Sequence, residues 1–189
     1  MRASLRPLFW SAAVATALAL PAAASAQQPL GAVTVSARSA RADDLDARAA
    51  ELQASNSRWQ WRRSAELREQ AAGLRSPSDP RAFEALHSAA LVRHVLGDRG
   101  RAIALMERAA DQALARGDVF SAASSFSTLA YMSAEAGDPR RSREFAGRSL
   151  LLAESPLLSA QQRASLQAQL AEGTPPAAGA ALAVVPTLP

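Results

Sequence analysis

The chain has 189 residues, of which 49% are hydrophobic and only 5% aromatic, and it contains no cysteine. The lack of cysteine excludes a disulfide framework and thiol chemistry, and the scarcity of aromatics means that a core must come from closely packed alanine-rich helices. All 21 basic residues are arginine, against 17 acidic residues. A balance this even gives no indication of nucleic-acid or anionic-membrane binding, so no nucleic-acid partner is expected.

The first 26 residues have the three parts of a secretory signal peptide. Arg2 and Arg6 precede an apolar run over 8–20, and a small-residue segment ends at Ala26. Cleavage after Ala26 would leave a periplasmic or secreted chain that starts at Gln27. The apolar run has 13 residues, fewer than the roughly 20 that a spanning helix needs, so a retained anchor is the weaker alternative. No stable membrane span is expected after cleavage.

Residues 27–40 carry Pro29, Gly31 and a short alternating run over 32–35, without helical periodicity. We therefore expect a flexible leader, or alternatively a lone strand that would need the sheet edge of a partner. A helical-repeat domain is expected over 41–172, and the uncharged alanine- and proline-rich segment 173–189 is expected to be a disordered tail.

The domain begins with a predicted helical hairpin over 41–75. Its first helix opens with several carboxylates, which favour the positive end of the helix dipole, and its second helix carries Trp59 and Trp61. We expect both indole rings to lie in the core or between repeats. Pro77 and Pro80 end the hairpin, because proline interrupts a helix interior but is favoured at the first helical position.

Two further helix pairs are predicted over 81–116 and 119–154. Each pair contains a Gly-Asp turn, at Gly97-Asp98 and Gly137-Asp138, and the two turns are forty residues apart. Glycine is the usual residue where a helix ends in the left-handed conformation. A last helix over 157–171, entered through Pro156, has the mixed polar and apolar character of a capping helix. The fold class expected is all-α, with antiparallel helix pairs stacked as a short α-solenoid.

These helix pairs resemble tetratricopeptide (TPR) repeats. The matching positions are the first-helix positions, the turns and the second-helix positions at Leu86, Ala90, Gly97, Asp98, Ala102, Met106, Ala109, Phe126, Leu129, Ala130, Gly137 and Asp138. Three second-helix positions of the later pair depart from the family pattern, at Ser142, Ala146 and Ser149. The period of forty also exceeds the usual 34. The resemblance covers about 75 residues and implies long-helix, TPR-like units.

The resemblance also implies a concave groove, lined by the first helix of each pair, that holds a peptide or a partner protein. Its implied lining residues are Glu84, His87, Leu91, His94, Ser127, Tyr131 and Glu135. The lysine and asparagine clamp that some members use for a terminal carboxylate is missing, since His87 and Leu91 stand where it would begin. A partly apolar peptide is the better expectation.

The sequence contains no phosphate loop, no HExxH and no GxSxG pattern, so no catalytic residue and no cofactor are expected. His87 and His94 are seven residues apart on one helix, which separates them by roughly 10 Å and is too far for a shared metal ion. The trio Arg140, Arg141 and Arg143 is expected to form a solvated face offset by Asp138 and Glu144.

The functional expectation is a non-catalytic, exported interaction module of a bacterial envelope. An accessory subunit of a membrane-associated envelope complex is the first alternative, and an enzyme with an unrecognised site is the second. Neither the partner nor the oligomeric state follows from the sequence.

Overall fold

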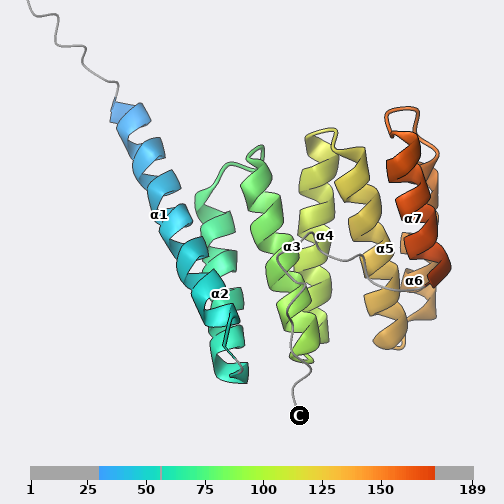
Figure 1. Ribbon diagram of the computed structural model, residues 1–189, viewed down its shortest axis with the longest axis horizontal. Coiled ribbons are helices and arrows are strands. Elements are labelled where there is room, and N and C mark those ends of the chain that lie inside the picture. Colours follow the sequence, from blue (N-terminus) through green and yellow to red (C-terminus); the bar gives the residue numbers. More distant parts are fainter. Residues whose placement is uncertain (1–29, 56, 173–189) are drawn as a thin grey trace, which may run out of the picture.

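The computed structural model describes residues 30–55 and 57–172, so the expected signal peptide and C-terminal tail lie outside the described residues (Figure 1). The described part contains helices and no strand. Its seven helices are α1 (Leu30–Gln53), α2 (Arg58–Leu74), α3 (Pro80–Val95), α4 (Arg99–Ala115), α5 (Val119–Glu135), α6 (Pro139–Ala153) and α7 (Ala160–Glu172). Each of α1 to α6 packs against the next in sequence, and α7 contacts both α5 and α6. The expected all-α, solenoid-like arrangement of helix pairs is confirmed.

Three turns of one kind join α3 through α6. Gly97, Gly117 and Gly137 have φ of 83°, 72° and 79°, the left-handed conformation that glycine adopts without steric cost. In each turn the N–H of the following aspartate donates to the carbonyl five residues earlier, at 2.9 Å in all three. This is the Schellman hydrogen bond of a helix C-terminus. The turns recur every twenty residues, so one geometry serves both within and between the helix pairs.

Helix α1 begins well before the start expected from the sequence. The leader expected over 27–40 is helical from Leu30, and only its first three residues lie outside the described part. Helix α1 is anchored by Ala42, Leu45 and Ala49, which form a small core with Leu67 and Ala71 of α2. Residues 34–41 are almost all exposed. They have no apolar stripe for a periodicity argument to find, and they extend a helix that is already nucleated by this packing.

Helix α7 begins three residues later than the expected start at Leu157. The Ser159 N–H donates to Gln162 Oε1 at 2.9 Å, and the Gln162 N–H donates to Ser159 Oγ at 3.2 Å. These reciprocal bonds form a capping box, which fixes Ser159 as the residue before the helix. Leu158 and Leu166 are buried against Ala123 and Ala153, so α7 covers the end of the α5–α6 pair.

The main core runs from α2 to α6 and is built from alanines around a few large side chains. Trp61, Leu86, Met106, Leu129 and Met132 are almost fully buried within it. Small residues let neighbouring helices approach closely, and two serines use that closeness. Ser64 Oγ donates to the Ala49 carbonyl of α1 at 2.7 Å, and Ser149 Oγ donates to the Ala123 carbonyl of α5 at 2.8 Å. A serine at position 149 therefore joins the α5–α6 pair by a hydrogen bond that alanine could not make.

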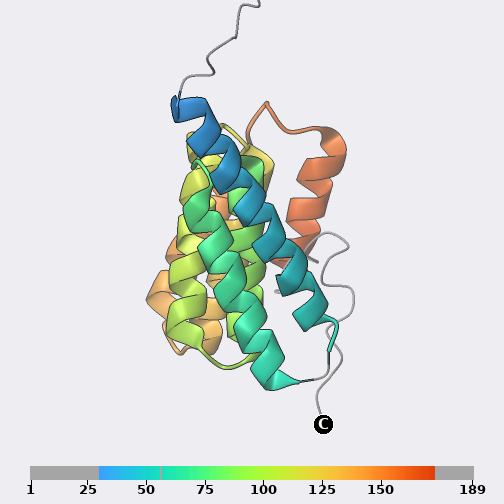
Figure 2. The same cartoon turned by 90° about the vertical axis from the view of Figure 1, so that its left-hand side faces the viewer.

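Polar contacts join alternate helices into two layers. On one side Arg81 of α3 lies 2.9 Å from Asp43 of α1, and His94 of α3 lies 2.9 Å from Glu135 of α5. On the other side Glu69 of α2 pairs with Arg101 of α4, and Glu107 of α4 pairs with Arg141 of α6. We call α1, α3, α5 and α7 the odd-helix layer and α2, α4 and α6 the even-helix layer. Figure 2 views the stack along its length, with α1 nearest to the viewer.

Candidate functional site: a polar cluster between α3 and α5

Three of the seven implied groove residues meet between α3 and α5. His94 Nε2 lies 2.9 Å from Glu135 Oε2, and the Tyr131 hydroxyl donates to Glu135 Oε1 at 2.8 Å. The rings of His94 and Tyr131 meet edge to face, with centroids 5.7 Å apart and planes at 69°. His94 lies on α3, whereas Tyr131 and Glu135 lie on α5. We call these three residues the α3–α5 cluster.

Partial burial sets the charges of the cluster. The side chain of His94 is 15% exposed, and loss of solvation lowers its pKa, although the Glu135 carboxylate acts in the opposite direction. The hydrogen bond to Glu135, followed by burial, raises the pKa of Tyr131. At neutral pH the cluster therefore combines a neutral imidazole, a protonated phenol and a carboxylate. The contact with Glu135 assigns the imidazole proton to Nε2, which leaves His94 Nδ1 buried without a hydrogen-bond partner.

The other histidine of α3 has an apolar neighbour. The His87 ring lies 5.5 Å from the Phe83 ring, and burial lowers the pKa of His87 to about 4. This imidazole is neutral at pH 7. The guanidinium of Arg116, at the end of α4, lies over the Phe83 ring, 5.4 Å from the ring centroid. Phe83, His87 and Arg116 thus form an aromatic and cationic patch near the start of α3.

Two implied groove residues belong to the core instead. Leu91 is 8% exposed and packs in the main core, and Ser127 is 6% exposed. Both residues therefore offer little surface to a partner, which differs from the groove lining that the family resemblance implies. Each of these helices has alanines on several sides, so packing against both neighbours, rather than the sequence of the helix alone, decides which side faces inward. Glu84 is exposed on α3, ten residues and therefore about 15 Å along the helix from His94.

The two tryptophans of α2 point in different directions. Trp61 is buried and its indole N–H donates to the Ser55 carbonyl at 2.6 Å, whereas Trp59 is 68% exposed. Trp59, Arg62, Arg63 and Glu66 line a shallow surface depression. The core position expected for both rings is therefore wrong for Trp59. Residues two apart on a helix are separated by about 200°, a signal in the sequence that only one ring could face inward.

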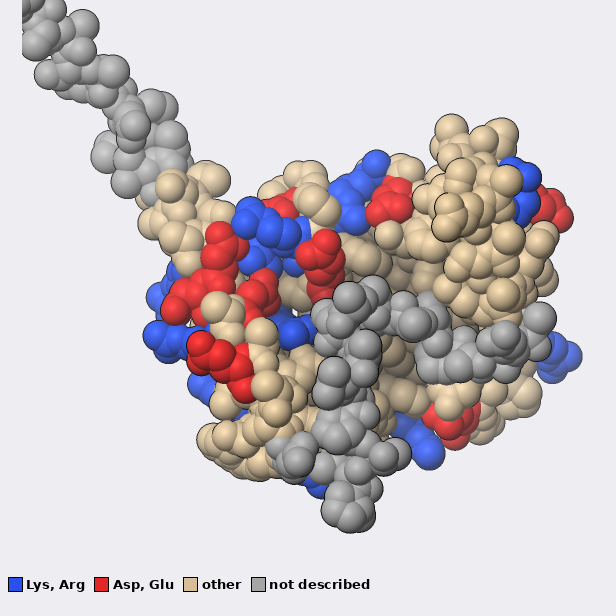
Figure 3. All heavy atoms as spheres, in the orientation of Figure 1, with Lys and Arg blue, Asp and Glu red and all other residues tan. Residues whose placement is uncertain are grey.

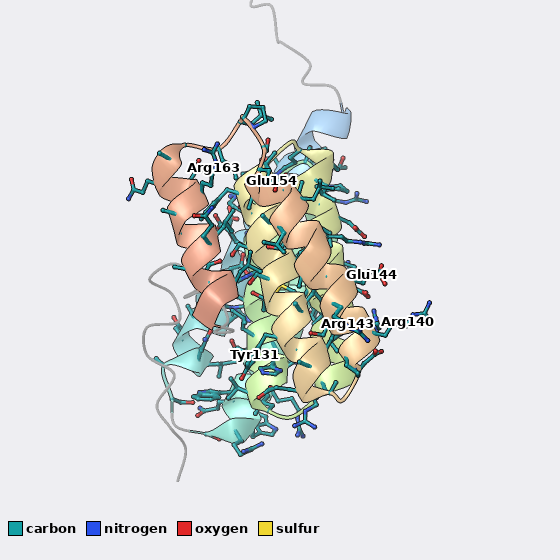
Figure 4. All side chains as sticks on the ribbon, turned by 90° about the vertical axis from the view of Figure 1, so that its right-hand side faces the viewer. Tyr131, Arg140, Arg143, Glu144, Glu154 and Arg163 are labelled. Carbon is teal, nitrogen blue, oxygen red and sulfur yellow. The ribbon has the colours of Figure 1, made fainter. Side chains whose placement is uncertain are left out.

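The arginine trio of α6 is only partly offset as expected. The side chain of Arg141 pairs with Glu107 of α4. Its backbone N–H donates to Asp138 Oδ1 at 2.9 Å, so Asp138 caps the start of α6. Glu144 pairs with Arg148 at 2.7 Å rather than with the trio. Figure 4 shows Arg140 and Arg143 projecting outward from α6, whereas Tyr131, on α5, lies nearer the middle of the molecule in this view.

Among residues 30–55 and 57–172, no group of three or more histidine, aspartate or glutamate side chains is placed to hold a metal ion. No helix of this part combines the length and apolarity required to cross a bilayer. In the view of Figure 1, charged side chains gather over α1, whereas the visible surface around α7 is mostly uncharged (Figure 3). The odd-helix layer is thus charged at one end and weakly charged at the other.

Comparisons of the chain with protein families, with curated proteins and with solved structures find no match.

Proposed function

We propose that the chain is an exported, non-catalytic interaction module, in which the odd-helix layer around the α3–α5 cluster binds a peptide or a partner protein. The observation that carries this proposal is the cluster itself. It presents a phenol, an imidazole edge and a partly exposed carboxylate from two adjacent helices of one layer. Tyrosine combines a large apolar area with a hydrogen-bonding tip and is enriched among residues that dominate binding energy.

The proposal includes membership of the TPR-like class. It is supported by the helix pairs and by the glycine turns at their expected positions. The chain departs from the usual TPR pattern in two ways. Its helices are longer, and its turns are spaced by twenty residues both within and between the helix pairs. We propose a periplasmic or secreted location, with cleavage after Ala26, on the sequence of the first 26 residues alone.

The surface favours a partner with basic or hydrogen-bond-donating side chains beside apolar ones. Glu135 is 39% exposed and Glu84 is exposed as well, while no arginine or lysine lies on α5. Val95, next to His94, is also exposed. A peptide that crosses from α3 to α5 would meet a carboxylate near each end of α3, with the exposed Val95 beside His94.

The test uses the chain from Gln27 with a photo-crosslinking amino acid at position 84 or 135, and a matched control at Ala104 of the even-helix layer. We expect envelope extract to yield one shared protein from positions 84 and 135 and not from 104. The purified partner should then bind Tyr131→Ala about tenfold more weakly than the wild-type chain.

Folding must be preserved for this comparison to count. Tyr131 is only half-buried, so Tyr131→Ala should keep the far-UV circular dichroism and melt close to the wild-type chain. Equal affinity of the wild-type and Tyr131→Ala chains for the purified partner would place binding elsewhere. Crosslinking from position 104 alone would reject the odd-helix layer.

A further inference from the structure

The arginines of the chain are concentrated in one layer. The even helices hold eleven arginines against five acidic residues, whereas the odd helices hold six against seven. The eleven are Arg58, Arg62, Arg63, Arg68, Arg99, Arg101, Arg108, Arg140, Arg141, Arg143 and Arg148. Nine of them are exposed; Arg68 and Arg141 are partly buried. The near balance of the whole chain therefore conceals an excess of positive charge on the even-helix layer.

The acidic residues of this layer do not neutralise the excess. Glu66 pairs with Arg63, Glu69 with Arg93 and Arg101, Glu107 with Arg141, and Glu144 with Arg148. Within the described part of the chain, Arg62, Arg108 and Arg140 take part in no ion pair. At least one guanidinium without an ion pair stands on each of the three even helices, so the unpaired charge extends along the stack.

The three even helices form one continuous surface. Arg101 and Arg141 occupy the same place in α4 and α6, forty residues apart, and each pairs with a glutamate of the preceding even helix. These contacts hold the helices edge to edge. Their outward faces, which carry the unpaired arginines, are therefore presented on the same side of the molecule.

Large apolar side chains lie on the same outward faces. Trp59 is 68% exposed and shares its face of α2 with Arg62 and Arg63, at helical spacings of three and four. Leu151 is 72% exposed and lies eleven residues, three turns, from Arg140 on α6. An indole and a leucine thus flank the arginines near the two ends of the layer.

We propose that the even-helix layer docks on a membrane surface that contains anionic phospholipid. Guanidinium groups match phosphate geometry, and juxtaposed basic residues are attracted to anionic headgroups within a Debye length. Tryptophan and leucine favour the boundary between headgroups and acyl chains, which neither a nucleic acid nor an acidic protein would provide. The arginines attract the layer to the anionic headgroups, and Trp59 and Leu151 insert at the boundary between the headgroups and the acyl chains. This docking is independent of the odd-helix layer and leaves the α3–α5 cluster free.

The first test is co-sedimentation of the chain from Gln27 with phosphatidylcholine vesicles, with or without phosphatidylglycerol. We expect binding only when phosphatidylglycerol is present, and about a tenfold loss between 0.1 M and about 0.5 M salt, since the Debye length falls with ionic strength. The variant Arg62→Gln, Arg108→Gln, Arg140→Gln should lose binding at least about tenfold. The matched control, Arg38→Gln, Arg41→Gln, Arg48→Gln on α1, changes the net charge equally and should bind like the wild-type chain.

The second test uses tryptophan fluorescence. The chain from Gln27 contains only Trp59 and Trp61, and Trp61 is already buried. Docking should shift the emission to shorter wavelength, and Trp59→Phe should abolish that shift while co-sedimentation persists. An unshifted emission in vesicle-bound wild-type chain would overturn the membrane orientation.

Other outcomes also reject the proposal. Equal losses in the two triple variants would mean that net charge, not this layer, governs binding. Binding of duplex DNA or polyglutamate at a salt concentration where vesicles do not bind would assign the face to another polyanion. Affinity for the partner of the odd-helix layer should be unchanged in the Arg62, Arg108, Arg140 variant, so each proposal can fail separately.

Discussion

The α1–α2 hairpin and the α3–α6 array are held together by different interactions. The array shares one continuous core, joined by three equivalent glycine turns. The hairpin has a separate core of five small and medium side chains, and it relies on Arg75, whose guanidinium pairs with Asp43 and Asp46 of α1. Helix α2 belongs to both, since Trp61 faces the array and Leu67 faces α1. The array therefore depends on one large apolar core, whereas the hairpin combines a small apolar core with a buried arginine that pairs with α1.

The largest expected contrast is between core truncations in the two regions. Leu86→Ala, at a fully buried site of the array, should lower the free energy of unfolding by about 4 kcal/mol. Leu45→Ala, in the hairpin core, should lower it by about 2 kcal/mol, because Leu45 is 9% exposed in a smaller core and α1 can shift to fill the space. Urea denaturation followed by circular dichroism gives both values. A larger loss for Leu45→Ala would contradict the difference drawn between the regions.

The second prediction concerns Arg75, whose side chain is 2% exposed. Arg75→Met should cost about 2 to 3 kcal/mol, because it leaves Asp46 without an ion-pair partner and Asp43 paired only with the exposed Arg81. Arg48→Met is the matched control: Arg48 pairs with Asp44 at 3.2 Å on the exposed face of α1, and its loss should cost less than about 0.5 kcal/mol. Hydrogen exchange should locate the effect of Arg75→Met in α1. Similar values for the two variants would refute this stabilising role of Arg75 in the hairpin.

The third prediction, with the smallest expected effect, is that the array and the hairpin lose stability at different pH values. The pKa of His87 is lowered from 6.5 to about 4, so the unfolded chain binds the proton first as the pH falls. Stability of the array should be complete above pH 6.5 and decline by about 2 kcal/mol down to pH 4. The ion pair with Arg75 lowers the pKa of Asp43, so the contribution of Asp43 is present above 3.8 and is lost only as the pH falls through its lower folded value.

Urea denaturation at several pH values measures whether the His87 contribution is lost at higher pH than the Asp43 contribution. His94 titrates in the same direction as His87, since burial lowers its pKa as well. The double variant His87→Gln, His94→Gln should therefore remove most of the slope between pH 6.5 and 4 and keep the loss below it. A slope unchanged in this variant would assign the acid sensitivity to other groups.

The sequence predicts the fold well where local chemistry decides the structure. The Gly-Asp pairs and Pro80 and Pro139 mark helix ends, because left-handed glycine and first-turn proline are local requirements. Prediction fails at the start of α1, where the β-branched residues Val33, Thr34 and Val35 suggest a strand or leader. Their helical state follows from the packing of Ala42 and Leu45 further along, which no local pattern records.

The candidate site is predicted only in part for a related reason. His94, Tyr131 and Glu135 do meet, but Leu91 and Ser127 are buried, because the rotation of an alanine-rich helix depends on both of its neighbours. The basic even-helix layer is invisible in the total charge. It emerges only when alternate helices are known to lie side by side, as the contact of Glu107 with Arg141 requires.

The twenty-residue spacing of the turns has a consequence for how this chain could change in length. Because Gly97 and Gly137 are equivalent positions, a deletion of residues 98–137 would join Gly97 to Asp138 and recreate the same turn. Loss or duplication of such a forty-residue block keeps every remaining helix in its own layer. The odd-helix and even-helix layers can therefore be lengthened or shortened together, by one helix each. The length of each surface is thus easier for evolution or engineering to vary than its composition.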